Sequence, residues 1–242
     1  MSTTSEPRVL VIIPAYNEQD SLFHVITNVR TAMPVADVLV INDGSHDDTP
    51  QVAREAGAIV VTLPYNLGIG AAVQTGFIFA AERGYDVAVQ VDGDGQHNPA
   101  EIPEIIAPVI AGKADVVIGS RYIEDRGYVT PPVRRIGIVI LAKYISVLVR
   151  QRFTDTTSGF RATNRQGVEL CADMYPSDYP EPESLVLFRK VGLRVMEVPV
   201  TMNPRYGGQS SITPFWSAYY MAKVMLAIAV WQLRSRPKLR KA

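Results

Sequence analysis

The sequence is poor in the residues that build disulfides and zinc sites. It has one cysteine, Cys171, and three histidines among 242 residues. A single thiol excludes an internal disulfide, and three scattered histidines leave no structural zinc set. Residues 1–7 are polar and lack the apolar segment of a secretory signal. We therefore expect a protein of the reducing, cytoplasmic side of the membrane.

An excess of charge of one sign is also absent. Lys plus Arg and Asp plus Glu each number 24, so the formal net charge is zero. This balance gives no reason to expect nucleic acid as a partner. With 47% hydrophobic residues, the chain can bury a substantial core. We expect one large domain over residues 8–211 with an appendage over residues 212–242.

Two familiar nucleotide-binding loops are missing. No Walker loop occurs, and the glycine-containing segment 66–73 matches a dinucleotide fingerprint poorly, because Val73 occupies the third glycine position. The loop after the first apolar run contains no glycine at all. A dinucleotide-binding or P-loop enzyme is therefore not expected.

Short β-branched runs alternate with longer helical stretches over the first half of the chain. The runs cover residues 9–13, 38–41, 58–62, 87–91 and 116–118. Continuous apolar strands separated by helices are typical of an α/β fold with a mostly parallel sheet and flanking helices. Ligands of such sheets bind beyond the carboxyl ends of the strands, so the loops there should carry the chemistry.

The most informative loop follows the fourth run and contains Asp92 and Asp94. Two positions apart at a strand end, these carboxylates can point the same way and share one cation. Oxygen ligands without cysteine suit a hard ion such as Mg²⁺ or Mn²⁺. An ordinary Asp-Gly turn is the alternative. A calcium loop is excluded, because His97 and Pro103 occupy the positions of its required Gly and Glu.

The loops after the first two runs add further polar groups at the same edge. Glu18 and Asp43 are expected to contact a base or ribose, whereas Asp47 and Asp48 are more simply helix caps and turn formers. Arg121 follows the fifth run and is a candidate phosphate partner, with a solvated surface position as the alternative.

The ordered series of these loops closely resembles family 2 glycosyltransferases of the GT-A (Rossmann-like) fold. The segments that carry the resemblance are residues 14–18, 42–45, 66–68, 92–97, 119–121 and 155–161. It extends over about residues 9–212, and the most similar branch is that of dolichol-phosphate mannose synthase and polyprenyl-phosphate glycosyltransferases. The resemblance implies an inverting transfer of a hexose from a UDP- or GDP-sugar to polyprenyl phosphate.

The resemblance also implies roles for individual residues. Nucleotide binding is expected from Pro14, Ala15, Tyr16, Glu18, Asp43, Asn66, Gly68 and Asp92. The metal, Mg²⁺ or Mn²⁺, is expected at Asp92, Asp94 and Gln96. Substrate binding is expected from Gln96, Arg121, Ser158, Glu183 and Ser210, and catalytic roles from Asp94, Asp155, Arg161 and Arg205. Gln96 and His97 are expected to face the incoming acceptor.

Two of these roles have structural alternatives. Asp155 is either a general base, which a hydroxyl acceptor would need, or a structural hydrogen-bond acceptor. A lipid monophosphate has a second pKa near 6 and is already ionised at neutral pH, so it asks little of Asp155. Glu183, in a proline-stiffened turn, either caps a helix or binds the donor hexose.

Two apolar helices are expected in the second half of the chain. Residues 134–152 are bracketed by arginines and carry Lys143, which makes them too short and too charged for a comfortable span. They are either an interfacial helix or a core helix. Residues 215–233 carry aromatic residues near both ends, and a basic tail follows. Such a segment is typical of an amphipathic membrane-associating helix.

These features predict a protein bound peripherally to the inner face of the membrane. A separate integral membrane protein is expected to supply the membrane spans that related chains carry. One alternative is an enzyme that elongates a glycan through a hydroxyl acceptor, and another is a non-catalytic sugar-nucleotide-binding subunit of a membrane complex. Sugar-phosphate nucleotidyltransferases are disfavoured, because residues 14–18 lack the glycine-rich loop that a triphosphate needs.

Overall fold

A seven-stranded sheet forms the centre of the computed structural model, which describes residues 6–128, 130–203 and 214–233. The strands lie in the order β3-β2-β1-β4-β6-β5-β7. Their bounds are Val9–Ala15 (β1), Asp37–Asn42 (β2), Ile59–Thr62 (β3), Val87–Gln90 (β4), Val116–Ser120 (β5), Arg161–Asn164 (β6) and Val195–Pro199 (β7). Among the seven strands in the described part of the chain, only the pairs that involve β6 are antiparallel. The prediction of a mostly parallel sheet is confirmed, although β6 and β7 were not predicted.

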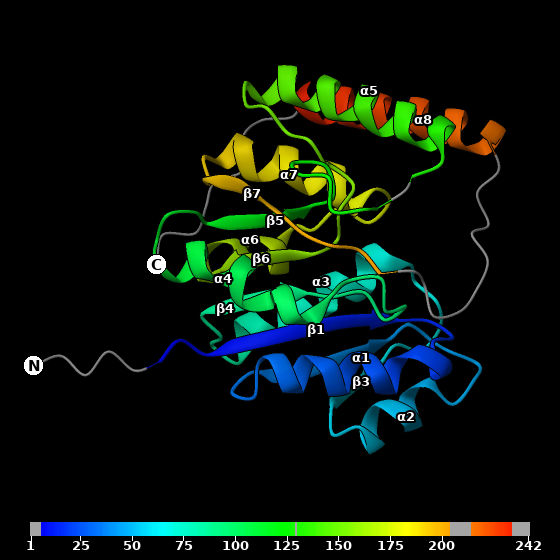
Figure 1. Cartoon of the computed structure of the whole chain (residues 1–242), viewed down its shortest axis with the longest axis vertical. Coiled ribbons are helices and arrows are strands. Elements are labelled where there is room, and N and C mark those ends of the chain that lie inside the picture. The colour runs from blue at the N-terminus through cyan, green and yellow to red at the C-terminus, as the bar shows by residue number, and fades with distance from the viewer. Residues whose placement is uncertain (1–5, 129, 204–213, 234–242) are drawn as a thin grey trace, which may run out of the picture.

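Helices cover both faces of this sheet (Figure 1). Their bounds are Gln19–Ala32 (α1), Thr49–Glu55 (α2), Ile69–Glu82 (α3), Ile102–Ile110 (α4), Pro132–Val149 (α5), Arg165–Asp173 (α6), Pro180–Val191 (α7) and Pro214–Leu233 (α8). A short 3₁₀ turn, Pro99–Glu101, precedes α4. Asn98 caps that turn by accepting a hydrogen bond from the Ala100 amide at 3.2 Å.

The alternation of side chains along β1 divides the core into two layers. Leu10 and Ile12 face a cluster that includes residues of α3, α5, α6, α7 and α8, while Val11 and Ile13 face a cluster with α1 and α4. All four side chains are fully buried, and each such burial contributes roughly 1.5–3 kcal/mol. Gly76 of α3 allows close packing, because a Cβ there would lie 2.3 Å from Ile12 Cγ2. The sequence of β1 thus requires helices on both sides.

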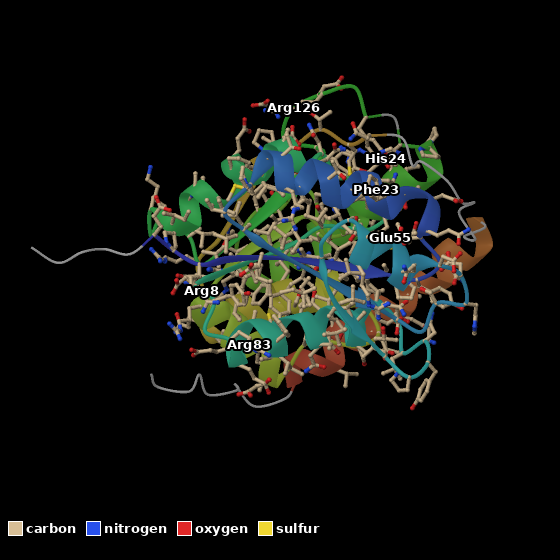
Figure 2. The ribbon with its side chains drawn as sticks, turned by 90° about the horizontal axis from the view of Figure 1, so that it is seen from below. Arg8, Phe23, His24, Glu55, Arg83 and Arg126 are labelled. Carbon is tan, nitrogen blue, oxygen red and sulfur yellow. The ribbon has the colours of Figure 1, made fainter. Side chains whose placement is uncertain are left out.

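The amino-terminal edge of the sheet is closed by contacts of Arg8. Its backbone amide donates to Asp86 Oδ2 at 2.9 Å, and its Nη1 donates to the Arg83 carbonyl at 2.7 Å. The guanidinium also lies over the Tyr85 ring, 4.5 Å from its centroid. Figure 2 shows Arg8 and Arg83 at this edge. Arg8 thus ties the start of β1 to the segment between α3 and β4, at the edge opposite the carboxyl ends of the parallel strands.

Helices α5 and α8 lie side by side at one end of the molecule and form an outer helical layer (Figure 1). Tyr144 of α5 donates a hydrogen bond to the Met225 carbonyl of α8 at 3.1 Å. Within the described residues, no helix is long and apolar enough to cross a membrane. The boundary expected near residue 212 and the basic tail 234–242 lie outside the described residues.

Candidate active site

A cavity of about 350 Å³ opens at the carboxyl ends of the parallel strands. It is lined by Pro14, Ala15, Tyr16, Glu18, Asp43, Asn66, Gly68, Ile69, Ala72, Asp92, Gly93, Asp94 and Glu181. All the residues expected to bind the nucleotide are among them, so the structure brings four separate loops together at one place. The walls combine carboxylates, which accept hydrogen bonds from hydroxyl and N–H groups, with the backbone of small residues.

Asp43 organises the nucleotide side of this cavity. Its two carboxylate oxygens accept hydrogen bonds from the backbone amides of Leu67 and Gly68, at 2.7 and 2.9 Å. Gly68 has a φ of +90°, a conformation that favours glycine. Asp43 is only 3% exposed. It therefore joins the loop after β2 to the start of α3 and shapes the cavity wall.

Asp47 has the structural role that the sequence favoured for it. It accepts hydrogen bonds from the backbone amides of Thr49 and Gln19, at 3.0 and 3.3 Å. Burial opposes its ionisation, but the hydrogen bonds from Thr49 and Gln19 outweigh this and lower the pKa of Asp47. Asp47 thus joins the first residue of α1 to the first residue of α2 and fixes the loop after β2 between them.

The acidic motif after β4 is held by hydrogen bonds from its own backbone and from α1. The Gln96 amide donates to Asp94 Oδ1 at 3.0 Å, and Ser21 of α1 donates its hydroxyl to the Gly93 carbonyl at 2.7 Å. The Asp92 side chain is 37% exposed, whereas Asp94 is 7% exposed. Both aspartates line the cavity.

The donor set of the cavity fits a hard divalent cation that arrives with a ligand. Among the described residues, no group of three or more His, Cys, Asp or Glu side chains could hold a metal alone. Mg²⁺ is usually bound through one or two carboxylates together with substrate phosphates and water. Asp92 and Asp94 supply this number of carboxylates, so diphosphate oxygens would complete the shell.

Glu181 lines the cavity and was missed by the sequence analysis, which selected Glu183 in the same turn. Glu183 is not among the cavity residues. Burial raises the pKa of the Glu181 carboxyl, and the nearby charge of Asp92 adds to the effect, while Arg161 opposes it. The turn contains two glutamates two positions apart, and only the orientation of the first turn of α7 distinguishes them.

Arg161 lies buried at the start of β6 and holds this turn of α7. Its Nη2 donates to the Glu181 carbonyl at 2.9 Å, and its Nη1 donates to Ser184 Oγ at 2.8 Å. Its Nε donates to the Ser158 carbonyl at 2.7 Å. All three guanidinium nitrogens are thus engaged within the protein. The contacts place Arg161 and Ser158 where they position Glu181, and a direct contact with substrate stays a prediction.

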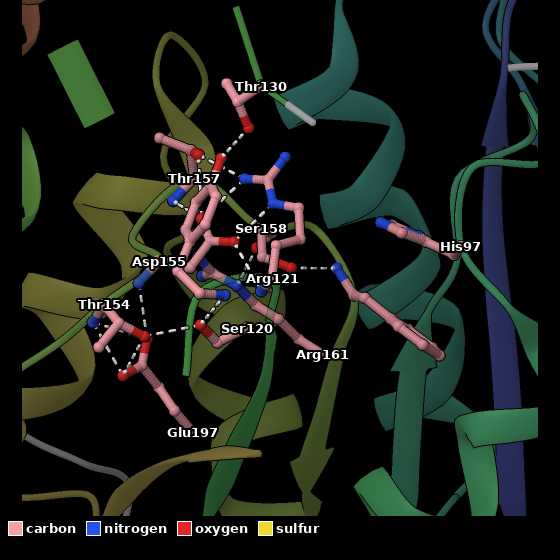
Figure 3. A network of polar contacts seen from close by, with 12 residues as sticks. His97, Ser120, Arg121, Thr130, Thr154, Asp155, Thr157, Ser158, Arg161 and Glu197 are labelled. Carbon is pink, nitrogen blue, oxygen red and sulfur yellow. Dashed lines mark hydrogen bonds and ion pairs between the residues drawn. The ribbon is translucent and has the colours of Figure 1, made fainter. Parts of the chain in front are cut away.

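Asp155 and Arg121 form a buried ion pair (Figure 3). Arg121 donates through Nε to Asp155 Oδ2 at 2.6 Å and through Nη2 to Oδ1 at 2.7 Å. Thr157 adds a hydroxyl contact to Oδ1 at 3.1 Å. Asp155 is fully buried. Although burial opposes ionisation, the Arg121 guanidinium keeps the pKa of Asp155 below its usual value. This geometry favours the structural alternative for Asp155 over a general base.

The loop that carries Asp155 is fastened to the edge strand β7 by Glu197. Its carboxylate accepts hydrogen bonds from the backbone amides of Thr154 and Asp155, at 2.9 and 2.8 Å. Burial raises the pKa of Glu197. Figure 3 shows Glu197 next to Thr154 in this network. β7 therefore fixes the loop at Thr154 and Asp155 through the Glu197 carboxylate, a contact that the sequence did not indicate.

Arg135 of α5 was also missed, and it lies close to Arg121. Its guanidinium carbon is 3.6 Å from the centroid of the Tyr122 ring, and that of Arg121 is 5.3 Å from the same centroid. Nη1 of Arg135 is buried without a hydrogen-bond partner. The guanidiniums of Arg121 and Arg135 therefore both lie near the Tyr122 ring, and Nη1 of Arg135 has no hydrogen-bond acceptor among the described residues. An anion would supply that acceptor.

Three expected positions need separate comment. The expectation that His97 faces an incoming acceptor was wrong: the side chain is 2% exposed and its ring stacks on Phe160. Phe160 is large and apolar, and its burial draws the imidazole inward. Arg205 and Ser210 lie outside the described residues, so their roles stay predictions.

A mostly parallel sheet with an acidic, nucleotide-sized cavity at its carboxyl edge defines a GT-A-like glycosyltransferase fold. Residues 10–169 match the family model of glycosyl transferase family 2. The chain belongs to this family.

Individual relatives agree with that assignment. An undecaprenyl-phosphate mannosyltransferase of Micrococcus luteus is 33% identical, over 95% of this chain and 96% of the relative. A polyprenol monophosphomannose synthase of Mycolicibacterium smegmatis is 34% identical, over 95% and 88%. Among solved structures, glucosyl-3-phosphoglycerate synthase of Mycobacterium tuberculosis with Mn²⁺, UDP and phosphoglyceric acid has a TM-score of 0.71 at 20% identity, covering 94% of this chain and 78% of that one. This last similarity concerns the fold.

Proposed function

We propose that this chain transfers a hexose from a UDP- or GDP-sugar to a polyprenyl phosphate at a membrane surface. The membership of family 2 supports a glycosyltransferase, and the names of the two relatives support a lipid phosphate as acceptor. The burial of Asp155 is the observation that favours a phosphate acceptor over a hydroxyl acceptor. A carboxylate held by Arg121 on both oxygens is a poor base for a hydroxyl acceptor, whereas a phosphate acceptor needs none.

The nucleotide sugar is proposed to occupy the cavity at the carboxyl edge of the sheet. Tyr16, Glu18, Asp43, Asp92 and Asp94 all line this cavity. In this proposal the first three residues lie around the nucleoside, and the two aspartates lie at the diphosphate. These two carboxylates, with Gln96 beside them, would hold Mg²⁺ or Mn²⁺. The bound cation would supply charge neutralisation for the departing diphosphate. Without a cation, the carboxylates of Asp92 and Asp94 would repel the negatively charged diphosphate. This repulsion supports a requirement for a metal ion.

The acceptor phosphate is proposed to lie at Arg121 and Arg135. Two guanidiniums around the Tyr122 ring, with a buried unpartnered Nη1 on Arg135, suit a phosphate group. A phosphate oxygen attacks the anomeric carbon and forms the new C–O bond. The bond between that carbon and the diphosphate breaks, and the electron pair leaves with the nucleoside diphosphate. No proton has to be removed from the phosphate dianion. Arg205 and Ser210 are proposed to close over the donor.

The outer helical layer is proposed to rest on the cytoplasmic membrane face and bring the lipid to Arg135, which is part of α5. Exposed apolar side chains on α5 and α8 support this arrangement, among them Ile136 at 61% and Leu226 at 66% exposure. Neither helix contains an acidic residue, and α5 adds Lys143 on its exposed side. Anionic lipid attracts such a surface. A separate membrane-protein partner stays a prediction, which co-purification from solubilised membranes would test.

The decisive experiment combines purified protein with a panel of UDP- and GDP-sugars and Mn²⁺ or Mg²⁺. Release of the nucleoside diphosphate is followed with and without polyprenyl phosphate. We expect release that depends on the lipid phosphate, and its loss in Asp94→Ala. Transfer to free sugars or glycans, with none to the lipid, would contradict the proposal.

A hydroxyl acceptor is the second candidate, and one observation favours it. Glu181 lines the cavity, and its pKa is raised by burial, which brings a carboxyl nearer to the range of an efficient general base. Under this alternative, Glu181→Gln would abolish transfer to a hydroxyl acceptor. Under the leading proposal, Glu181→Gln weakens donor binding and leaves transfer to polyprenyl phosphate measurable.

A further inference from the structure

His97 has two contacts with Asp92 that define the state of its ring. The backbone amide of Asp92 donates to His97 Nδ1 at 3.0 Å, so that nitrogen carries no proton. The proton of a neutral ring is then on Nε2, which lies 3.5 Å from Asp92 Oδ2. One side chain therefore holds both the backbone and the carboxylate of Asp92. The ring is 2% exposed, which protects these contacts from water.

Two other parts of the chain hold the ring and its backbone in place. The ring stacks on Phe160 with a centroid distance of 4.8 Å and an interplanar angle of 14°. Phe160 is fully buried and belongs to the segment that links Asp155 to β6. The backbone of His97 forms a bridge with Met202, and the Asn203 amide donates to the Gln96 carbonyl at 2.8 Å. The stack on Phe160 fixes the imidazole, and the bridge to Met202 fixes its backbone, so the position of the ring beside Asp92 is set by the rest of the chain.

We propose that His97 is a positioning residue, which holds the Asp92 carboxylate in the orientation that a divalent cation on a nucleoside diphosphate requires. The inference rests on the proposed function, because it assumes that Asp92 contacts that cation. A side chain that orients a metal-binding carboxylate typically changes metal affinity or activity by 10–100-fold when it is replaced. His97 is not among the residues that line the cavity, so its effect passes through Asp92.

Two substitutions at this position separate the hydrogen bond from the packing. His97→Phe keeps an aromatic ring on Phe160 but removes the acceptor for the Asp92 amide. His97→Asn loses the stack but places Oδ1 where Nδ1 was. Binding of Mn²⁺ is measured by electron paramagnetic resonance titration in the presence of UDP and, separately, GDP. His24→Phe is the control, because His24 is exposed on α1, as Figure 2 shows, and would report adventitious Mn²⁺ binding by surface histidine.

We expect His97→Phe to raise the dissociation constant of Mn²⁺ about tenfold. His97→Asn should restore part of this loss, because its Oδ1 accepts the Asp92 amide although nothing replaces the Nε2 contact with the carboxylate, and it should unfold at a lower temperature. A purely structural role would give the reverse order, because the phenylalanine packs better than the asparagine. Equal Mn²⁺ affinity in wild type and His97→Phe would overturn the proposal, as would a wild type that binds no Mn²⁺ with either nucleotide. If His97→Phe does not fold, Phe160→Leu is measured in its place. We expect it to raise the dissociation constant of Mn²⁺ by less than about tenfold, and an unchanged constant would overturn the proposal.

Failure of the proposed function would look different. In that case the wild type still binds Mn²⁺ with UDP or GDP, and the two His97 variants still differ, but no hexose reaches polyprenyl phosphate. The binding experiment therefore tests His97 without relying on turnover.

Discussion

Asp155 shows how burial decides the role of a reactive side chain. Its carboxylate has the chemistry of a base, but it is fully buried and bound to Arg121 and Thr157. Loss of one partner would leave the other charge buried and uncompensated, which is far more costly than the loss of an exposed ion pair. Asp155 and Arg121 are therefore best regarded as one unit that shapes the acceptor side of the site.

Replacement of Asp155 by Asn tests the strength of this unit. We expect a loss of about 3 kcal/mol in the free energy of unfolding near pH 7, measured by urea denaturation. Arg165→Gln, which removes an exposed partner of Asp86 and Glu169, is the control and should cost less than about 1 kcal/mol. A similar small effect for both variants would contradict the assignment.

The same variant gives an expected pH dependence. The pKa of Asp155 in the folded state is lowered, so the folded state holds its proton less tightly than the unfolded chain, whose value is about 3.9. Its stabilising contribution is complete above that unfolded value and is lost as the pH falls through the folded value. The stability difference between wild type and Asp155→Asn should therefore stay constant from pH 7 to pH 5 and shrink below about pH 4. Urea denaturation at these pH values measures it.

Gly159 is required by the crowding around Asp92. A Cβ at this position would lie 2.9 Å from Gln90 Nε2 and 3.1 Å from Asp92 Oδ1. Gly159→Ala should therefore displace the Asp92 carboxylate and lower nucleotide-sugar turnover at least about tenfold, the size expected when a metal-binding carboxylate is misoriented.

Gly137→Ala on α5 is the matched control for this change. Among the side chains that the structure describes, a Cβ there would meet only Met221 atoms at 3.8 Å, an ordinary contact. Because alanine favours a helix, this variant should be neutral or more stable by about 0.5–1 kcal/mol, with turnover unchanged. Turnover assays and thermal unfolding of the two variants provide the comparison, and equal activities would refute the crowding argument.

Among the secondary-structure elements, α5 and α8 have a distribution of apolar residues that the core does not explain. Ile136, Ile140 and Val147 are 61%, 49% and 77% exposed along one side of α5, although Leu141 and Ile145 on its other side are fully buried. Spacings of four and seven residues place the exposed three on one helical face. A helix that needed only to cover the sheet would have polar residues there.

We expect Ile140→Glu to weaken binding to anionic phospholipid vesicles, because it places a carboxylate on this exposed apolar face. Co-sedimentation with vesicles of phosphatidylglycerol and phosphatidylcholine measures the effect, and at least a fivefold loss is expected from one desolvated charge. Val35→Glu is the control, since Val35 is 76% exposed in the turn after α1. Identical binding of both variants would exclude α5 as the docking face.

For the complete fold, removal of metal and nucleotide should leave the structure intact. The core lies between the sheet and its helices on both faces, whereas the cavity is at one edge and is lined by loops. We therefore expect a chelator to leave the unfolding temperature of the free protein unchanged. UDP or GDP with Mn²⁺ at 100 times the dissociation constant should stabilise it by about 2.7 kcal/mol. Thermal unfolding checks both, and unfolding by the chelator alone would contradict this arrangement.

The sequence was sufficient for the sheet and for most of the cavity. Continuous apolar runs bury both faces of a strand, and the carboxyl ends of parallel strands meet at one edge. The loops after β1, β2 and β4 therefore had to converge, and Asp43, Asp92 and Asp94 line one cavity as a result. The family followed from the order of these motifs and is confirmed by the match over residues 10–169.

Tertiary contacts alone decided the rest, because local patterns contain no information about distant partners. Asp155 is 34 residues from Arg121 in the sequence, and neither residue indicates that the other will neutralise it. The choice between Glu181 and Glu183 depends on how Arg161 orients the first turn of α7. His97 faces inward because Phe160, from a different strand connection, offers it an apolar surface. Residue types and their order determined which reactive side chains the protein has. Packing and desolvation determined which of those side chains face the cavity and which are held in buried structural contacts.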